Sequence, residues 1–327
     1  MVKTEYKIGF IGSGLIAKKH LLVIKSNYKD IKIAGCLNPK FNHKNKENLN
    51  YLENIFGRLY CDLNEWLNSE KPDVVYICTP PFARFDYERE LIKRGIHYFV
   101  EKPPLSSNQN DLVKLLEDKY QIVIKLGYQW RYLKFNNELI DLIRDDDIGY
   151  INILRFNGLP FQDWKLNHKL SFGNTYERLM HVTDYCEYIF NKNLNPISFT
   201  VGESKINNTI ESNSNLPDAE VFVFKIGDAI GTMSSVSYSQ SNDIFEITFV
   251  GKKYIYRISA NTNKKIKLEA VSLNKVIKKY SDLTDELYVR ESIDFIESVK
   301  NKDFSSTMTY LKSIETATRV LDTINNK

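Results

Sequence analysis

Hydrophobic positions follow two alternating periods along the first 130 residues of the chain. Between short apolar runs lie stretches with the spacing of amphipathic helices. The apolar runs, rich in β-branched residues, cover 6–12, 31–37, 73–78, 96–100 and 121–126. The helix-like stretches cover 15–26, 45–55, 84–94 and 107–118. Strands that alternate with helices in this way are typical of a doubly wound parallel sheet, covered by helices on both faces.

The pattern changes near residue 126. Beyond it, helix-like segments near 132–145 and 175–190 precede a series of β runs between about 196 and 280, and two helix-like segments near 285–300 and 308–325 close the chain. Within the β runs, apolar and polar residues alternate, as they do in antiparallel strands with one buried face. We therefore predict two domains, 1–126 and 127–327, which agrees with a length of 327 residues.

Composition narrows the class of protein. The chain is 43% hydrophobic and carries a net charge of only +4, with its lysines spread rather than clustered, so we predict no nucleic-acid partner. The four cysteines lie far apart and form no metal-binding pair. Because the N-terminus lacks an apolar leader and no apolar run approaches 18 residues, we expect a cytoplasmic protein with no membrane partner.

A glycine string follows the first strand directly. Gly12-Ser13-Gly14-Leu15-Ile16-Ala17 has the form G-x-G-x-x-A and opens the first helix of a βαβ unit. In that context the first glycine permits a tight turn, the second lets the backbone approach a pyrophosphate, and the helix N-terminus offers free N–H groups. An ordinary strand-to-helix turn is the alternative.

Further polar residues follow the ends of later predicted strands, where ligands bind in open α/β sheets. Asn38 stands where NAD-binding proteins often carry an acidic residue, and Lys40 is suited to attract a 2′-phosphate, so the cofactor preference leans towards NADP. Glu101-Lys102-Pro103 follows the fifth predicted run. A lysine there can hold a substrate hydroxyl or stabilise charge on a carbonyl oxygen, unless it is simply a solvated loop residue.

The glycine string, "DVVYICTPP" and "GIHYFVEKP" resemble, in this order and spacing, the Gfo/Idh/MocA family of NAD(P)-dependent oxidoreductases. The resemblance implies an N-terminal Rossmann domain and a C-terminal α/β domain with a large open, mostly antiparallel sheet for substrate binding and oligomerisation. It also implies a carbohydrate-type substrate and a homodimer or homotetramer. The residues that it and the strand-end pattern assign to the cofactor are Gly12, Ser13, Gly14, Leu15, Ile16, Asn38, Lys40, Thr79, Pro80, Glu101 and Lys102.

The second domain contributes a histidine flanked by carboxylates. Glu177, His181 and Asp184 have the spacing i, i+4 and i+7, which places them on one face of a helix. Either carboxylate is placed to orient the imidazole, and one histidine alone predicts no metal site. The family commonly has Asp-x-x-x-His-x-x-Asp here, which implies that His181 transfers the proton and Lys102 is its partner. Glu177 departs from the usual Asp.

Other residues complete the predicted substrate site. Pro81 and Arg84 stand where relatives often carry Asn and His, so Arg84 is a clamp for a substrate anion or a surface charge. Tyr128 and Arg131 resemble the family segment that approaches the substrate, and Trp130 is assigned to packing. Trp164 and His168 lie on a loop that often lines the sugar site, where Trp164 is suited to stack on a sugar.

These inferences predict hydride transfer between NAD(P) and a secondary hydroxyl or ketone of a sugar, cyclitol or sugar nucleotide. Lys102 would polarise the oxygen and His181 would exchange its proton. Two alternatives stay open. One is a non-catalytic cofactor or sugar sensor on the same fold, and the other is an enzyme that reduces a C=N bond.

Overall fold

A computed structural model defines the fold of the protein and divides it into two compact units. Unit 1 comprises Met1–Gly127 and Tyr288–Ile314, and unit 2 comprises Tyr128–Leu287 and Glu315–Lys327. The described residues are 5–39, 46–104, 109–117, 121–156, 158, 163–171, 174–202, 219–237, 244–260, 264–273 and 275–325.

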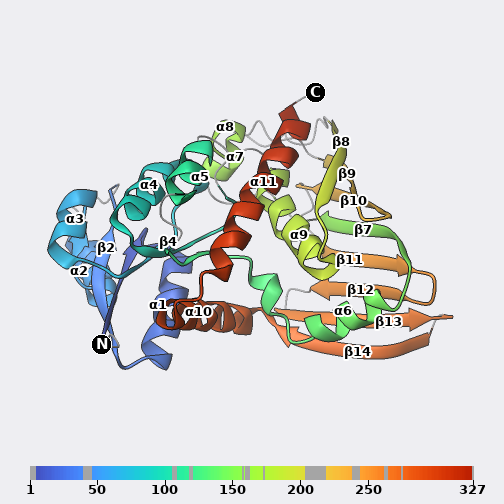
Figure 1. The fold of residues 1–327 in the computed structure, drawn as a ribbon, viewed down its shortest axis with the longest axis horizontal. Helices are drawn as coiled ribbons and strands as arrows, with labels where there is room; N and C mark the ends of the chain where they lie inside the picture. The colour runs from blue at the N-terminus through green and yellow to red at the C-terminus, as the bar shows by residue number, and fades with distance from the viewer. Residues whose placement is uncertain are drawn as a thin grey trace. The chain divides into compact units, whose positions relative to one another are not determined.

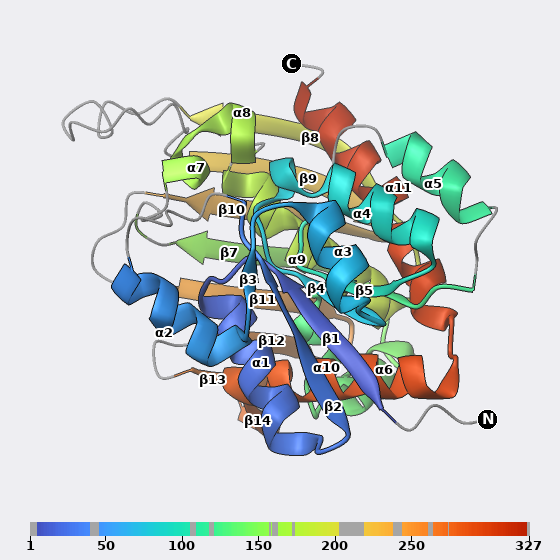
Figure 2. The same ribbon diagram turned by 90° about the vertical axis from the view of Figure 1, so that its left-hand side faces the viewer.

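Unit 1 is built on a six-stranded parallel sheet. Its strands are β1 (Tyr6–Ile11), β2 (Ile31–Leu37), β3 (Leu59–Tyr60), β4 (Val74–Ile77), β5 (His97–Val100) and β6 (Ile124–Leu126). Their order is β3-β2-β1-β4-β5-β6, and β1 and β2 lie side by side in Figure 2. The order reverses between β1 and β4, and the carboxyl ends of strands at such a reversal form the usual ligand crevice of open α/β sheets. The predicted Rossmann-type sheet is confirmed.

Helices cover both faces of this sheet. They are α1 (Leu15–Asn27), α2 (Lys46–Phe56), α3 (Leu63–Glu70), α4 (Phe85–Arg94), α5 (Gln109–Glu117) and α10 (Thr284–Asn301), with a short 3-10 helix, η1 (Pro81–Ala83). In Figure 1, α4 and α5 lie above the sheet and α1 and α10 below it. Side chains of α1, α2 and α10 share one hydrophobic core with the strands, which includes Phe10, Leu21, Phe56 and Phe295.

Unit 1 differs from the sequence prediction in two respects. The prediction did not include β3 or α3, because β3 has only two residues and α3 is short. It also assigned the whole of 127–327 to the second domain, whereas Tyr288–Ile314 belongs to unit 1. The reason is packing: Phe295, Ile296 and Val299 of α10 are buried in the unit 1 core. The predicted helix start at Ser106-Ser107 lies outside the described residues, and α5 begins at Gln109.

Unit 2 contains an eight-stranded sheet. The strands are β7 (Ile148–Phe156), β8 (Leu194–Gly202), β9 (Ala219–Ile226), β10 (Ala229–Val236), β11 (Ile244–Gly251), β12 (Ile255–Ala260), β13 (Lys265–Ser272) and β14 (Lys275–Leu283). Their order is β14-β13-β12-β11-β7-β10-β9-β8, and the pairing is antiparallel except between β7 and β10. The expected open, mostly antiparallel sheet is confirmed.

One face of this sheet packs on helices. The described helices that lie wholly or partly in unit 2 are η2 (Gln129–Tyr132), α6 (Asn136–Arg144), α7 (Asp163–Leu166), α8 (His168–Ser171), α9 (Asn174–Phe190), α11 (Ser305–Asn325) and the first turn of α10. α9 contacts β8, β9 and α6, and the Phe190 ring lies 5.8 Å from that of Phe249. Burial alternates along β10 and β11, so every second side chain points away from these helices.

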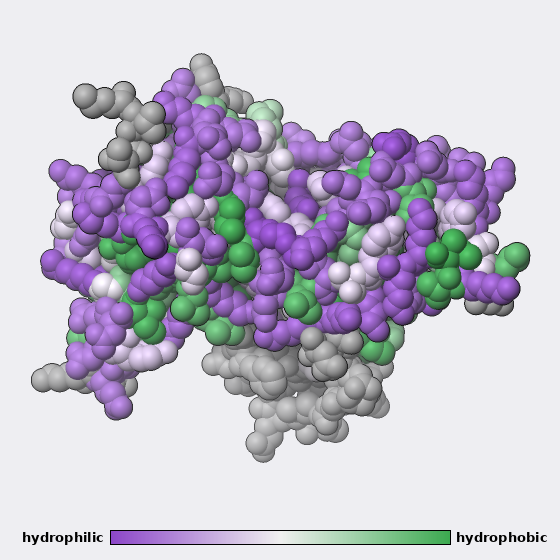
Figure 3. All heavy atoms as spheres, turned by 90° about the horizontal axis from the view of Figure 1, so that it is seen from below, coloured by the Kyte–Doolittle hydropathy of each residue, from purple (hydrophilic) through white to green (hydrophobic). Residues whose placement is uncertain are grey.

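The outward-pointing side chains of this sheet include a row of apolar residues. Tyr150, directly paired with Ile230 and Val250, lies at its centre, and Ile255 is paired in turn with Val250. Ile230 is 50% exposed and Tyr150 is 40% exposed. Figure 3 shows the molecule from below. The surface on this side is mostly hydrophilic, with hydrophobic residues in scattered patches. Among the described residues, no helix combines the length and apolarity needed to cross a membrane.

Candidate active site

The glycine turn of unit 1 depends on Gly12. Its φ is +94°, a region that favours glycine, and its N–H donates to the carbonyl of Leu37 at 2.9 Å. A Cβ at this position would lie 3.1 Å from both the carbonyl oxygen of Cys78 and Cγ2 of Thr79. Gly12 therefore brings the ends of β1, β2 and β4 close together, as a dinucleotide-binding turn requires.

The N-terminus of α1 is suited to an anion. α1 begins at Leu15 after Gly14, no described side chain caps it, and its first turn contains no acidic residue. A Cβ on Gly14 would meet no described heavy atom within 4 Å, so the backbone is open to a ligand here. The N–H groups and the positive end of the helix dipole favour a phosphate at such a position. These residues fit the pyrophosphate of a nicotinamide dinucleotide.

Asn38 lies at the carboxyl end of β2, next to the glycine turn. Its Nδ2 donates to Oγ of Ser13 at 2.8 Å, which brings these two predicted cofactor residues together. Thr79 lies at the end of β4, and its Oγ1 is buried without a hydrogen-bond partner among the described residues. Such a hydroxyl fits a site that a polar ligand completes. Lys40 lies outside the described residues.

The Glu101-Lys102-Pro103 turn directly follows β5. Lys102 is half-buried, and its peptide bond to Pro103 is cis. Beside it, Oε1 of Glu101 lies 3.2 Å from Nε2 of His20, and Nδ1 of His20 lies 2.7 Å from Oγ of Ser292. Helices α1 and α10 thus fix the Glu101 side chain, and the turn is anchored to the core of unit 1.

Glu291 joins this cluster. One side-chain ligand atom each from His20, Glu101 and Glu291 lies within 4.8 Å of the other two. These residue types bind divalent metals, but burial, followed by the nearby Glu101 carboxylate, raises the pKa of Glu291 well above its usual range. Burial therefore disfavours the charged form of Glu291 within this cluster. The sequence analysis missed this cluster because His20 and Glu291 lie far apart along the chain.

Arg84 is the main correction in unit 1. It was expected to be a substrate clamp or a surface charge, but its side chain is only 2% exposed. Its Nε donates to the carbonyl of Thr79 at 2.7 Å, and its Nη1 donates to the carbonyls of Glu101 and Pro103. The guanidinium therefore binds backbone carbonyls of the two predicted ligand-binding segments.

The histidine of unit 2 lies on α9, as predicted. Glu177, His181 and Asp184 share this helix, with His181 half-buried and Asp184 buried. The ring of Tyr128, which is 2% exposed, lies 6.3 Å from the His181 ring in an edge-on arrangement. Three of the predicted substrate residues, Glu177, Asp184 and Tyr128, therefore lie near the predicted proton-transfer residue within unit 2. Lys102 belongs to unit 1.

The carboxylates that flank His181 form ion pairs with other residues. Asp184 accepts two hydrogen bonds from Arg131, at 2.8 Å from Nε and 2.6 Å from Nη2. This contact raises the pKa of Arg131 although burial opposes it. Glu177 lies 3.4 Å from Nζ of Lys165. Each of the two carboxylates thus has a cationic partner that the sequence analysis did not assign to it.

The tryptophans differ in their surroundings. Trp130 packs on Phe245 with ring centroids 4.5 Å apart and on Tyr185 at 5.4 Å, which confirms its packing role. Trp164 is half-buried, with Nζ of Lys165 lying 5.4 Å from its ring. The side chain of His168 lies outside the described residues.

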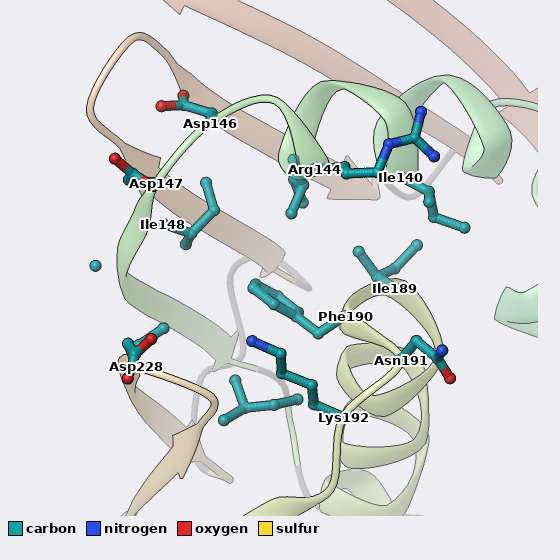
Figure 4. A pocket seen from close by; sticks show the side chains of 14 residues that line it. Ile140, Arg144, Asp146, Asp147, Ile148, Ile189, Phe190, Asn191, Lys192 and Asp228 are labelled. Carbon is teal, nitrogen blue, oxygen red and sulfur yellow. The ribbon is translucent and has the colours of Figure 1, made fainter.

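Unit 2 also contains a cavity of about 730 Å³ away from these residues. It lies between the end of α6, the start of β7, the end of α9 and the β9–β10 turn. Ile148, Ile189 and Phe190 point into it, and Arg144 and Asp228 lie at its sides (Figure 4). No predicted site residue lines it.

The parallel sheet, the glycine turn and the uncapped α1 N-terminus define a dinucleotide-binding protein of the Rossmann class. Residues 6–127 match a family model described as "Oxidoreductase family, NAD-binding Rossmann fold". In this segment the chain is similar to the Gfo/Idh/MocA oxidoreductases.

Individual proteins resemble the chain beyond this segment. Glucose-6-phosphate 3-dehydrogenase of Bacillus subtilis (strain 168) is 24% identical over 195 residues, which cover 56% of this chain and 53% of that protein. The match thus spans about half the length of that relative. A levoglucosan dehydrogenase with NADH and levoglucosan has a TM-score of 0.76 at 13% identity, covering 99% of this chain and 98% of that one. A 3-ketoreductase of Actinomadura kijaniata, solved with TDP-benzene and NADP, also has a TM-score of 0.76, at 9% identity and 97% and 96% coverage. At these identities the solved structures show a shared fold.

Proposed function

We propose that the protein is an NAD(P)-dependent oxidoreductase that acts on a secondary hydroxyl or ketone of a sugar, cyclitol or sugar nucleotide. The observation that carries this proposal is the glycine turn, where Gly12 adopts a positive φ and α1 begins without a side-chain cap. The family match over residues 6–127 supports the cofactor class. The glucose-6-phosphate 3-dehydrogenase relative and the levoglucosan complex support a carbohydrate substrate.

The nicotinamide cofactor, when bound, accepts or donates the hydride. In oxidation, we assign His181 to take the proton from the substrate hydroxyl and Lys102 to hold the same oxygen. In reduction, Lys102 polarises the ketone and His181 returns the proton. The Tyr128 ring packs edge-on against the His181 ring and is proposed to hold it in place. The Arg131–Asp184 ion pair is proposed to order the polar side chains on the same side of α9. Glu177 and Trp164 are proposed to contact the substrate.

The preference between NAD and NADP depends on the end of β2. We propose that Asn38 favours NADP, because an amide does not repel a 2′-phosphate as a carboxylate would. Its hydrogen bond to Ser13 places the amide beside the glycine turn. Lys40 is assigned to the 2′-phosphate from the sequence alone. Solved proteins of this fold include complexes with NADH and with NADP.

The first experiment is a fluorescence titration of the purified protein with NADH and with NADPH, followed by a panel of sugars, cyclitols and sugar nucleotides. We expect binding of at least one dinucleotide and turnover of a carbohydrate. Lys102→Ala and His181→Ala should each lower kcat about 10²–10⁴-fold, because each group acts in the chemical step. His181→Ala should leave the dinucleotide Kd unchanged, because His181 is not among the residues assigned to the cofactor. Lys93→Ala on the exposed side of α4 is the matched control.

Four results would contradict parts of the proposal. If neither dinucleotide binds, the glycine turn is only a turn. Binding without turnover of any carbohydrate or imine would favour a sensor. Reduction of imines alone, with no carbohydrate turnover, would favour the C=N reductase. Full turnover by His181→Ala would remove its assigned role.

We further propose that the outer face of the unit 2 sheet binds a second copy of the chain. Tyr150, Ile230, Val250 and Ile255 form a continuous apolar row across β10, β7, β11 and β12. A row of this kind, flanked by polar positions, is typical of an interface. This supports a homodimer or a homotetramer.

A further inference from the structure

One buried arginine binds the whole turn that contains Lys102. Nη1 of Arg84 donates to the carbonyl of Pro103 at 2.8 Å and to that of Glu101, and Nη2 lies 3.4 Å from the carbonyl of Lys102. Three consecutive carbonyls thus face a single guanidinium. Its Nε donates to the carbonyl of Thr79, which connects this turn with the end of β4.

Only an arginine has the geometry for this arrangement. Its five N–H donors form a rigid planar fork, so one side chain can bind several carbonyls from fixed directions. A lysine at the same position would present one compact ammonium and could not keep the same set of contacts. Because the backbone at Lys102 is held on both sides, the direction in which its side chain leaves the chain is also fixed.

Glu88 lies one helical turn away from Arg84 and carries a negative charge only above its raised pKa of about 7. It is 1% exposed, and it accepts hydrogen bonds from the hydroxyls of Tyr310 at 2.5 Å and Tyr98 at 3.3 Å. Its carboxylate interacts electrostatically with Arg84, which lies four residues earlier at the N-cap of α4. The backbone carbonyls stabilise the buried Arg84 cation at any pH, and the ionised Glu88, held in place by the two tyrosines, adds to this above about pH 7.

We propose that Arg84 is a positioning residue that holds the Glu101–Pro103 turn and thereby aims the Lys102 ammonium at the reacting oxygen. The residue acts through the backbone of the turn and does not itself bind substrate. This inference rests on the proposed function of Lys102, and it assigns to Arg84 a role different from both alternatives that its sequence position suggested.

The test compares Arg84→Lys with Arg89→Lys, a control on the same helix whose side chain is 43% exposed. In the preferred reaction, we expect Arg84→Lys to lower kcat about 100-fold, as small misplacements of catalytic groups do, with KM and dinucleotide Kd nearly unchanged. Arg89→Lys should behave as the wild type. Added guanidinium should restore part of the kcat of Arg84→Ala.

A second readout does not require turnover. Lysines are reductively methylated with ¹³C-formaldehyde, and the NMR signal of Lys102 is assigned by its loss in Lys102→Arg. We expect Arg84→Lys to shift this signal towards those of exposed lysines. An unmoved signal, or a kcat equal to wild type, would overturn the proposal. A fall in melting temperature and cofactor affinity with an unmoved signal would overturn it too, because Arg84 would then only support the fold. If no carbohydrate is turned over, the proposed function is wrong. The NMR measurement still tests whether Arg84 positions the Lys102 side chain, because it does not require turnover.

Discussion

Gly12 combines two constraints that can be separated by experiment. Alanine at this position must adopt a φ of +94° and also place its Cβ 3.1 Å from the Cys78 carbonyl and from Thr79. The positive φ alone costs about 1–2 kcal/mol. The close contacts would push the ends of β1 and β4 apart and distort the phosphate site. We therefore expect Gly12→Ala to weaken NADH or NADPH binding at least about tenfold, about 1.4 kcal/mol, in a fluorescence titration.

Gly57→Ala is the matched control for this prediction. Gly57 also has a positive φ, +77°, but a Cβ there would meet no described heavy atom within 4 Å. Alanine at Gly57 must also adopt a positive φ, but its Cβ makes no close contact like the one with Cys78 and Thr79 at Gly12. Both variants should lower the melting temperature, and only Gly12→Ala should weaken the dinucleotide. Equal affinity of the two variants would show that close packing at Gly12 is not what shapes the site.

Helix α4 contains a carboxyl group whose titration should affect stability. Burial is the largest influence on Glu88 and raises its pKa to about 7, against the opposing effects of Tyr310, Arg84 and Tyr98. Between the ordinary pKa of 4.5 and this value, the folded protein keeps a proton that the unfolded chain has released. The free energy of unfolding therefore falls as the pH rises through this window, by about 3 kcal/mol for this group.

Urea unfolding of wild type and Glu88→Gln at pH 5, 6, 7 and 8 measures this contribution. The amide does not titrate, so the stability of the wild type relative to Glu88→Gln should decrease between pH 5 and 7 and then level off. Glu90→Gln, on the same helix and paired with Arg94, provides a control. A constant difference between wild type and Glu88→Gln across these pH values would show that the Glu88 pKa is not raised.

At the level of elements, the sequence predicted best where one pattern determined the outcome. The buried strands and the site-bearing helices α1 and α9 follow from their periodicity. β14 was not recognised as a separate strand, although the predicted β region reaches about residue 280. Its side chains are almost all exposed and show no alternating buried face, and its strand conformation comes from pairing with β13. The return of α10 to unit 1 depends on tertiary packing of an apolar face, which periodicity does not assign to a particular core.

In the candidate site, too, features set by local sequence patterns were predictable and those set by tertiary contacts were not. Motif spacing located the glycine turn, Lys102 and His181, because each lies at a strand end or on a helix whose pattern is local. Partners far apart in the sequence were not predictable. The bond of Arg84 to the Pro103 carbonyl and the contact of His20 with Glu101 exist only once the sheet has formed. The charge of Arg84 indicated exposure, whereas its carbonyl partners stabilise it in the interior.

At the scale of the whole molecule, the outer face of the unit 2 sheet presents several exposed apolar side chains among the described residues. Its edge strand β14 carries Lys275, Lys278 and Lys279, and charged edges of this kind oppose strand-to-strand association. Its centre carries Tyr150, which is 40% exposed beside Ile230 at 50%. Association through the face rather than through this edge therefore buries apolar area and leaves the lysines in water.

Sedimentation at micromolar concentration tests this arrangement. We expect the wild type to sediment as a dimer or tetramer, and the double variant Ile230→Lys, Ile255→Lys to dissociate, because each added charge would be buried at the interface without a partner. Leu22→Lys, at a 65% exposed position of α1, is the control and should leave the assembly unchanged. The apolar row would not be the interface if the wild type sedimented as a monomer. The same would follow if the double variant sedimented at the same rate as an assembled wild type. Retained dinucleotide binding by the dissociated variant would show that assembly and the cofactor site of unit 1 are independent.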